Sequence, residues 1–313
     1  MVRHNGVERK ASAVQGPRGR DGRVTIRTVA EHAGRSISTV SAALNGSDGV
    51  AEKTREEILR IAAELGYQAD PRAQFLRRSH TGLIGASFAI GQAYQGLVVD
   101  GLYQAASALG HGLVLATSTP HRDVVDGLRA LLLERCEGII LIDPDIPVDA
   151  LARIVDRTPA AVIGSSTELS DVNEIHSRDD VGIQLLVDHL VDTGRRRITH
   201  VDGGRETAAM RRVKWFGQAM EQRGLGGGAR VVPGGGDEDS GAMVARRLIE
   251  TGELPEALLC FNDHCAVGAL MELRRQGVRV PQDVAVTGYD GIPVTAASAF
   301  SLTTVRQDAG LIA

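Results

Sequence analysis

The residue types that most often perform chemistry occur here without the spacing of a catalytic or metal-binding motif. Two glycine-rich runs, at 224–229 and 234–237, would cradle a phosphate group only between a strand and the start of a helix. The first run instead follows an expected helix, so we interpret it as a loop. His264 and Cys265 are neighbours, but no further ligand stands at zinc spacing from them. We therefore expect a protein that is not an enzyme and that uses no metal and no cofactor.

Positive charge is concentrated at the start of the chain. Residues 1–80 hold 14 Lys and Arg against 9 Asp and Glu, whereas the whole chain of 313 residues has a formal net charge of −4. This asymmetry predicts a small anion-binding module attached to a larger acidic domain. Residues 1–23 are rich in Gly and Arg, so we expect either a disordered basic tail or sequence that precedes the true start. Sparse cysteines and the lack of an apolar run of membrane-spanning length predict a cytoplasmic protein without a membrane partner.

Residues 24–68 have the pattern of three short helices. Apolar residues recur three or four positions apart in the first and third segments, which end at Gly34 and Gly66. Between them lies SISTVSAALNG, residues 36–46, in which two apolar residues stand four apart. Because almost no linker separates the first two helices, a helix-turn-helix bundle is predicted.

Beyond a basic segment at 69–80, which we expect to be a hinge helix or linker, residues 81–313 alternate apolar runs with helical patterns. Buried strands are expected at LIGASFAI, GLVLAT, GIILI, AVIGS, ITHVDG, ALLCFN and VAVTGYD, and helices at 94–109, 123–135, 180–194, 207–223, 239–252 and 263–276. This alternation is typical of parallel sheets covered on both faces. The number of elements predicts two α/β lobes with a ligand cleft at the carboxyl ends of the strands.

The segments VTIRTVAEHAGRSISTVSAALNG and VAEKTREEILRIAAELGYQADPRAQFLRR resemble the DNA-binding head and hinge of the LacI (lactose repressor) family. The later segments CEGIILI, VDHLVDTGRRRITHVDG, CFNDHCAVGAL and VPQDVAVTGYDGIP are similar to the effector domain of that family, in the same order. The resemblance implies an all-α helix-turn-helix head followed by a two-lobed, periplasmic-binding-protein-like α/β domain. It also implies a transcriptional regulator, specifically a repressor controlled by a sugar-type effector.

The resemblance assigns the DNA contacts to the second helix of the head. The residues that it predicts to contact DNA there and nearby are Thr25, Arg35, Ser36, Ile37, Ser38, Thr39, Ser41, Ala42 and Asn45. It places Ile37, Ser38 and Ala42 against bases. Ser36, Ser41 and Asn45 would lie against phosphates, because hydroxyl and amide groups near a helix N-terminus suit phosphate oxygens. Ala42 stands where the family usually has an arginine that reads guanine, so we expect apolar contacts instead, for example with a thymine methyl group.

The hinge of this family inserts a leucine into the minor groove. The matching residue is Leu76, with Ala73 and Gln74 beside it on the same short helix. An apolar wedge that unstacks a base step would kink the operator. The alternative is that Leu76 packs in a protein interface.

The resemblance also assigns an effector cleft to Arg212, Asn262 and Asp290. A guanidinium, an amide and a carboxylate that converge on a cleft suit a polyhydroxylated ligand. Further candidates for effector binding are Tyr94, Asp143 and Asp145. For each residue alone, a structural role is the alternative.

A homodimer is implied, whose two heads read a pseudo-palindromic operator. The segments 94–109 and 266–276 match the interface helices of the family, and Val267 and Leu270 are the expected contacts. In the family a helix and further strands follow the region that ends here at Ala313. The resemblance therefore implies a C-terminal truncation, from which we expect poor solubility or a weakened effector response.

Three other functions remain open from the sequence. A sugar-binding protein without a regulatory role would share the two-lobed core, but the expected helix-turn-helix and the lack of a signal segment argue against it. An enzyme built on the α/β core lacks a catalytic constellation. A non-functional truncated remnant is the third alternative.

Overall fold

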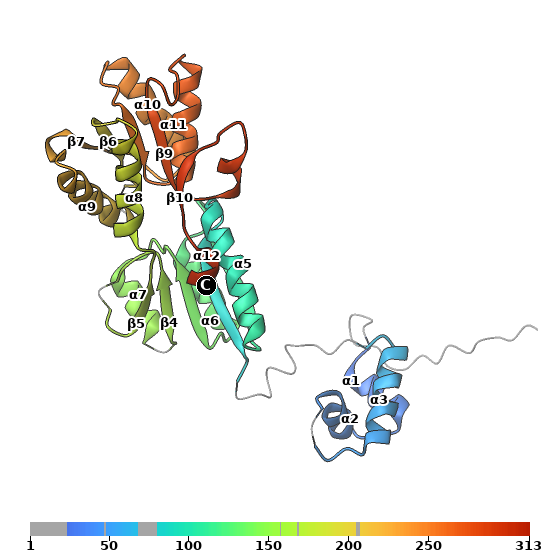
Figure 1. Cartoon of the computed structure of the whole chain (residues 1–313). Coiled ribbons are helices and arrows are strands. Elements are labelled where there is room, and N and C mark those ends of the chain that lie inside the picture. The colour runs from blue at the N-terminus through green and yellow to red at the C-terminus, as the bar shows by residue number, and fades with distance from the viewer. Residues whose placement is uncertain (1–23, 47, 68–79, 157, 168, 205–206) are drawn as a thin grey trace, which may run out of the picture. The chain divides into compact units, whose positions relative to one another are not determined.

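The computed structural model describes residues 24–46, 48–67, 80–156, 158–167, 169–204 and 207–313 (Figure 1). Its contacts divide the chain into two units, 1–80 and 81–313. The expected basic tail, and all of the expected hinge except His80, lie outside the described residues.

The first unit is a bundle of three helices, α1 (Ile26–Ala33), α2 (Ile37–Leu44) and α3 (Glu52–Glu64). One apolar cluster joins them, because Val29 of α1, Val40 of α2 and Ile58 of α3 are completely buried against one another. Gly34 has a φ of 61°, and this left-handed conformation lets the chain turn sharply from α1 into α2. The predicted helix-turn-helix pattern is confirmed.

Hydroxyl side chains cap the first two helices of this bundle but not the third. Thr25 and Thr28 form a capping box at the start of α1, and the Ser36 hydroxyl accepts a hydrogen bond from the Thr39 amide at 3.1 Å. Ala51 precedes α3 and makes no side-chain cap. The missing cap costs the head about 1 kcal/mol of stability.

The second unit contains two five-stranded sheets, and every strand pair in them is parallel. The first sheet has the order β2-β1-β3-β4-β5 and the second the order β10-β9-β8-β6-β7. The strands are β1 (Leu83–Ala89), β2 (Gly112–Ser118), β3 (Gly138–Ile142), β4 (Ala160–Ile163), β5 (Val172–Ile175), β6 (Ile198–Val201), β7 (Ala229–Val232), β8 (Ala257–Cys260), β9 (Ala285–Asp290) and β10 (Thr303–Arg306). The two-lobed α/β architecture predicted from the sequence is confirmed.

Helices flank both sheets (Figure 1). They are α5 (Ala93–Ala108), α6 (Val124–Leu133) and α7 (Val148–Val155) in the first lobe, and α8 (Asp179–Asp192), α9 (Thr207–Gln222), α10 (Glu238–Glu250) and α11 (Asp263–Arg275) in the second. A last turn, α12 (Ala309–Ile312), packs on α5, and two 3-10 turns are η1 (Gly226–Gly228) and η2 (Pro293–Ala296). Within the described ranges, no helix combines the length and the apolar character needed to cross a bilayer.

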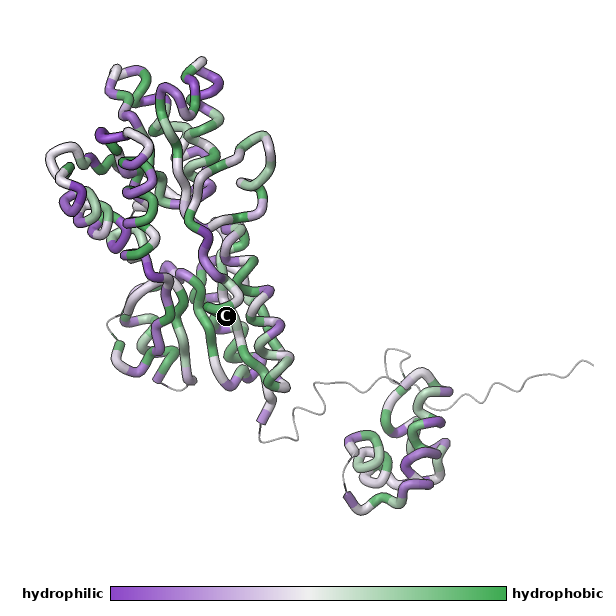
Figure 2. The backbone as a smooth tube through the Cα atoms, in the orientation of Figure 1, coloured by the Kyte–Doolittle hydropathy of each residue, from purple (hydrophilic) through white to green (hydrophobic). Residues whose placement is uncertain are grey.

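Each sheet carries an apolar cluster on both of its faces. In the first lobe Leu141 lies in one cluster and Ile142 in the other, because successive residues of β3 point to opposite faces. Leu258 and Leu259 of β8 divide the second lobe in the same way. Figure 2 shows the apolar residues gathered along the strands. Burial on both faces explains why these strands are continuous apolar runs in the sequence.

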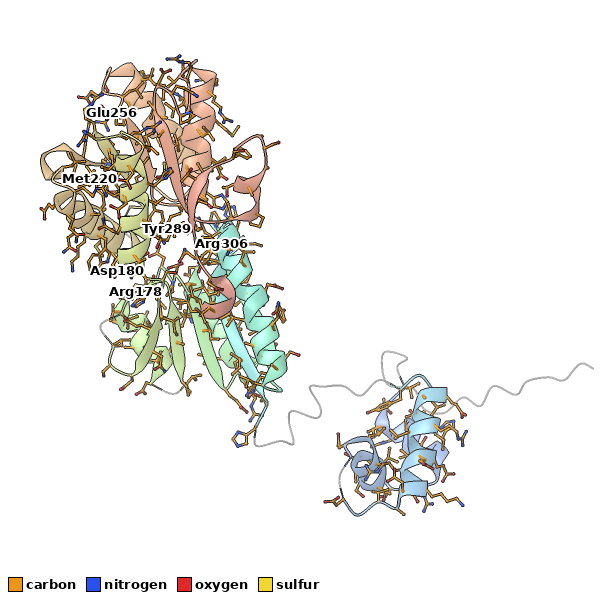
Figure 3. All side chains as sticks on the ribbon, viewed as in Figure 1. Arg178, Asp180, Met220, Glu256, Tyr289 and Arg306 are labelled. Atoms are coloured by element: carbon orange, nitrogen blue, oxygen red, sulfur yellow. The ribbon has the colours of Figure 1, made fainter. Side chains whose placement is uncertain are left out.

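The chain passes from the first lobe to the second at 176–178, between β5 and α8, and returns at 307–308, between β10 and α12. Between these two crossings, the loop after β9 reaches the first lobe at Ile292. Ile292 follows β9 of the second sheet, yet it is buried in an apolar cluster of the first lobe. Arg178 and Arg306, at the edges of the two crossings, lie at the junction between the lobes (Figure 3). The crossings bring residues that are distant in sequence to one site at the carboxyl ends of the strands.

Candidate functional site

The start of α2 presents an exposed surface with an apolar residue at its centre. Ile37 is 37% exposed, and Arg35, Ser36 and Ser38 around it are exposed as well. Val40, one turn further along α2, is completely buried and anchors the helix in the core of the head. A rigid helix therefore holds an uncovered isoleucine outward, which suits contact with a partner rather than packing within the head.

The polar side chains at both ends of α2 hold one another in place. The Ser36 hydroxyl lies 2.7 Å from the Ser38 hydroxyl, and at the other end the Asn45 amide donates to the Ser41 hydroxyl at 3.3 Å. Asn45 is exposed, whereas Ser41 is partly buried. Hydroxyl groups at a helix N-terminus are suited to donate hydrogen bonds to a phosphate group.

The remaining predicted DNA contacts have different positions. Thr39 and Ala42 are partly buried, and Thr25 takes part in the capping box of α1. Ala73, Gln74 and Leu76 lie outside the described residues, so the wedge in the minor groove stays a prediction.

A small cavity, of about 50 Å³, lies between the lobes at the carboxyl ends of their strands. Tyr94 and Asp143 of the first lobe line it, together with Arg212, Asn262 and Asp290 of the second. A water molecule needs roughly 10–15 Å³ of such space, so the cavity has room for a few waters only. A ligand of the size of a sugar requires the lobes to move apart.

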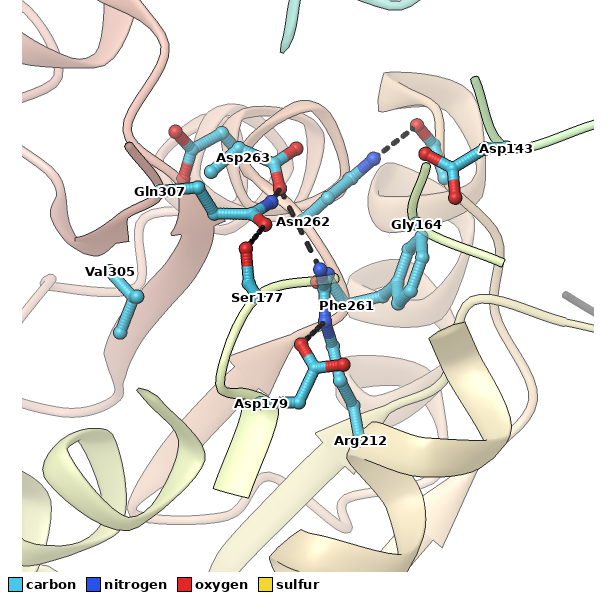
Figure 4. A network of polar contacts seen from close by, with 12 residues as sticks. Asp143, Gly164, Ser177, Asp179, Arg212, Phe261, Asn262, Asp263, Val305 and Gln307 are labelled. Atoms are coloured by element: carbon cyan, nitrogen blue, oxygen red, sulfur yellow. Dashed lines mark hydrogen bonds and ion pairs between the residues drawn. The ribbon is translucent and has the colours of Figure 1, made fainter. Parts of the chain in front are cut away.

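Arg212 of α9 is the centre of the polar network in this cavity (Figure 4). Its Nε donates to Asp179 Oδ1 at 3.1 Å, and its Nη1 donates to the main-chain oxygen of Phe261 at 2.7 Å. The guanidinium also stacks on the Tyr289 ring, 3.8 Å from the ring centroid. Arg212 is thus buried, oriented by fixed partners, and close enough to Asp290, at 3.9 Å, for a weaker ion pair.

Asp290 ends β9 in an unusual backbone conformation, with a φ of 122°. Its Oδ1 accepts a hydrogen bond from Gln307 Nε2 at 2.7 Å, and the Gln307 Oε1 accepts one from the Ser177 hydroxyl (Figure 4). Burial raises the pKa of the Asp290 carboxyl to about 8, although Arg212 acts in the opposite direction. The carboxyl can therefore act as a hydrogen-bond donor or acceptor near neutral pH.

The side chain of Asn262 is occupied by structural hydrogen bonds. Its Oδ1 accepts from the Cys265 amide at 2.9 Å as the N-cap of α11, and its Nδ2 donates to the Gly236 oxygen at 2.9 Å. Gly236 belongs to the second glycine-rich run, which here shapes the wall of the cavity. Asn262 lines the cavity, but its main role in this structure is to start α11 and hold that loop.

Of the other three effector-binding candidates, two line the cavity and one does not. The Tyr94 hydroxyl is buried in the cavity, and Asp143 lines the cavity with its partly buried carboxyl, whose pKa burial raises to about 6. Asp145 is exposed and lines a neighbouring hollow, which Asp143 and Gly203 of the second lobe also line. The structure therefore brings Tyr94 and Asp143 to the site and leaves Asp145 outside it.

Asp179 and Arg211 belong to the same network and were not predicted. Asp179 Oδ2 pairs with Arg211 Nε at 3.1 Å, so this one carboxylate holds both neighbouring arginines. Arg211 then donates to the main-chain oxygen of Gly164 at 2.6 Å, in the other lobe. The sequence signal was the paired arginine at 211–212, of which only the second was assigned.

Val267 and Leu270 are 7% and 2% exposed, respectively. They are buried within their own lobe, so the structure does not support the expected contacts with a second chain. On the same helix Met271 is exposed. The expectation erred because α11 is covered on most sides, with α10 packed against it at Gly268.

Two family models match the sequence of this protein. The model described as bacterial regulatory proteins, lacI family, matches residues 25–70, and the periplasmic binding protein-like domain matches residues 187–313. The HTH-type transcriptional repressor PurR of Haemophilus influenzae is 31% identical over 290 residues, which cover 90% of this chain and 86% of that protein. This chain belongs to the lacI family. It is a DNA-binding transcriptional regulator with an effector-binding domain, as the resemblance implied.

Solved structures of lacI-family members have the same fold. A LacI transcriptional regulator from a Rhodococcus species is 36% identical, with a TM-score of 0.71 over 74% of this chain and 86% of that chain. The lac repressor dimer bound to operator and the anti-inducer ONPF is 27% identical, with a TM-score of 0.81 over 92% of this chain and 89% of that chain. The second match includes the head as well as the lobes, so the family fold extends over both units of this lacI-family chain.

Proposed function

We propose that this protein is a cytoplasmic, homodimeric repressor whose binding to a specific operator is controlled by a small polyhydroxylated effector. The observation that carries the proposal is that one chain joins an exposed helix-turn-helix surface to a cleft lined by buried, oriented polar groups. The lac repressor, which resembles this chain, has been solved as a dimer bound to operator.

The start of α2 is the proposed reading surface for the major groove. Ile37 offers an apolar contact and Ser38 a hydroxyl, both on the exposed side of the helix. Neither supplies the paired donors that read guanine strongly, so direct readout is of moderate strength. A larger share of the specificity then comes from the deformation of DNA by the proposed Leu76 wedge.

The cavity between the lobes is the proposed effector site. Arg212 and Asp290 carry fixed donors and acceptors, and Tyr94 approaches them from the other lobe. Because the cavity is too small for a sugar, entry and capture of an effector must change the separation of the lobes. That movement is the proposed cause of ordering or melting in the hinge, which couples effector binding to operator binding.

The proposed dimer places two heads on the two halves of a pseudo-palindromic operator. Tyr103 of α5 and Met271 of α11 are exposed on the two helices that the resemblance assigned to the interface. They replace Val267 and Leu270 as the candidate contacts. Aromatic and methionine side chains are enriched in such interfaces.

Selection of binding sites from random DNA duplexes with the full chain tests this proposal. The expected result is enrichment of one sequence with two related half-sites. The variants Ile37→Ala and Ser38→Ala should then relax the base preference at positions within each half-site. Leu59→Ala is the matched control, because Leu59 is a similarly exposed apolar residue of the same bundle, on α3.

Two results would overturn the proposal. Absence of any enriched sequence would contradict specific DNA binding. An unchanged preference in the Ile37 and Ser38 variants, with a loss in the Leu59 control, would remove α2 from the reading surface.

A further inference from the structure

The charged side chains that line the cavity contain one more carboxyl than arginine. The charged residues are Arg211, Arg212, Asp143, Asp179 and Asp290. The lining also contains one histidine, His176. Both arginines pair with Asp179, at 3.1 Å each. Asp290 has only the longer contact to Arg212, at 3.9 Å, and Asp143 makes no ion pair within 4 Å among the described residues. The close contacts of both arginines are therefore with Asp179, and the other two carboxyl groups have at most one longer contact with a guanidinium.

An unsatisfied hydroxyl lies beside these two carboxyl groups. The Tyr94 hydroxyl is buried and has no hydrogen-bond partner among the residues that the structure describes. The neighbouring Ser177 hydroxyl donates instead to Gln307. Tyr94, Asp143 and Asp290 line the same cavity, and burial together with the charges of the two carboxyl groups raises the pKa of Tyr94. A buried hydroxyl without a partner is costly, and a bound ligand would remove that cost.

Both carboxyl groups are held in place by the backbone. Asp143 and Asp290 are two of the few non-glycine residues with positive φ, at 42° and 122°. Asp143 directly follows β3 in one lobe and Asp290 ends β9 in the other, and strained residues of this kind cluster at ligand-binding sites. The Asp143 carboxylate also lies directly over Gly164, where a Cβ atom would approach its Oδ1 to 2.1 Å. Each of the two carboxyl groups is thus held in place within its own lobe.

We propose that the effector carries a protonated amino group, which binds among Asp143, Asp290 and the Tyr94 hydroxyl, and that the effector is an amino sugar. An ammonium group favours the ionised form of both carboxyl groups and has three donors for three acceptors. The rest of the lining suits a sugar, because it combines amide side chains such as Gln92 and Gln307 with the apolar surface of Ile163 and Phe261. This inference rests on the proposed effector function of the cleft and specifies its ligand.

Calorimetric titration of the full chain at neutral pH tests the inference with matched pairs of probes. The probes are glucosamine, galactosamine and mannosamine, each compared with glucose, galactose and mannose, respectively. We expect at least one amino sugar to bind about tenfold or more tightly than its parent sugar, because charge-assisted hydrogen bonds are roughly twice as strong as neutral ones. The variant Asp143→Asn should reduce that preference, while Asp145→Asn, on the same segment but outside the cavity, should keep it.

The outcomes separate this inference from the proposed function. Parent sugars that bind as tightly as the amino sugars would overturn the ammonium inference and leave an effector site in place. Failure of all three amino sugars to bind would also overturn it. An unchanged preference in Asp143→Asn would remove Asp143 from the proposed contact. Specific DNA binding by the head is measured separately by site selection and is unaffected by any of these results.

Discussion

The guanidinium of Arg211 in the second lobe donates a hydrogen bond to the main-chain oxygen of Gly164 in the first lobe, at 2.6 Å. A second contact, to the Ser166 hydroxyl at 3.3 Å, strengthens the bridge. Because Asp179 orients the same guanidinium, the bridge is a fixed link between the lobes at the edge of the cavity. It joins the two lobes in this structure.

The variant Arg211→Ala is expected to loosen the closed state of the lobes. Hydrogen exchange measured by mass spectrometry should show faster exchange of backbone amides around 163–164 in the first lobe and around 261–262 in the second, which both line the cavity. Arg129→Ala is the control, because Arg129 forms an exposed ion pair with Asp126 on α6. Equal exchange in both variants would show that the Arg211 bridge does not hold the lobes together.

Gly164→Ala and Gly217→Ala are predicted to have effects of opposite sign. Gly164 has a φ of 86° and no space for a Cβ atom beside Asp143, so the substitution should cost about 1–3 kcal/mol. Gly217 lies within α9 with open space around its Cα, so alanine should stabilise the protein by about 0.5–1 kcal/mol. Denaturant unfolding of the two variants measures both values. A stable Gly164→Ala protein would contradict the described position of the Asp143 carboxylate.

Asp290 predicts a particular dependence of stability on pH. Its folded-state pKa of about 8 lies above the ordinary value of 3.8, so between these values the folded state holds a proton that the unfolded state has lost. This contribution to stability is present below pH 3.8 and declines as the pH rises to 8, at up to about 1.4 kcal/mol per pH unit. Urea unfolding across this interval should show that stability falls more steeply in the wild type than in Asp290→Asn. Parallel profiles would contradict the assignment.

Much of the architecture could be predicted because its elements have strong apolar periodicity. The helices α5, α6, α8, α9, α10 and α11 were all anticipated within a few residues. In contrast, three elements were missed: α7, β5 and β10. The two strands are half-exposed, have four residues each and lack a continuous apolar run. Short elements such as these are defined by the neighbours on which they pack, and a single sequence does not show those neighbours.

The site could be predicted only in part, for a related reason. Arg212 and Asp290 belong to recognisable motifs at the ends of elements, and both line the cavity. Asp179 is 32 and 33 positions before its two partner arginines, and no local pattern shows that pairing. Asn262 matched a motif, but only the structure shows that its side chain is occupied in capping α11.

Ala51→Ser should stabilise the head. A serine before α3 can accept a hydrogen bond from the first turn of that helix, as Ser36 does for α2, and the expected gain is about 1 kcal/mol. Thermal unfolding followed by the helical circular dichroism signal measures the gain. Thr25→Ala is the matched opposite change, because it removes the cap of α1 and should destabilise the head by a similar amount. A loss of stability in Ala51→Ser would contradict the described start of α3.

The central claim is that the cleft controls the head, and the most direct test is an operator-binding titration with the cleft empty and with it saturated. The DNA is the site selected by the full chain, and the small molecule is the probe that binds the cleft most tightly in calorimetry. The account predicts that saturation changes the operator dissociation constant by about 5- to 150-fold, and that operator changes the affinity for the small molecule by the same factor. An operator affinity that stays the same when the cleft is saturated would contradict it.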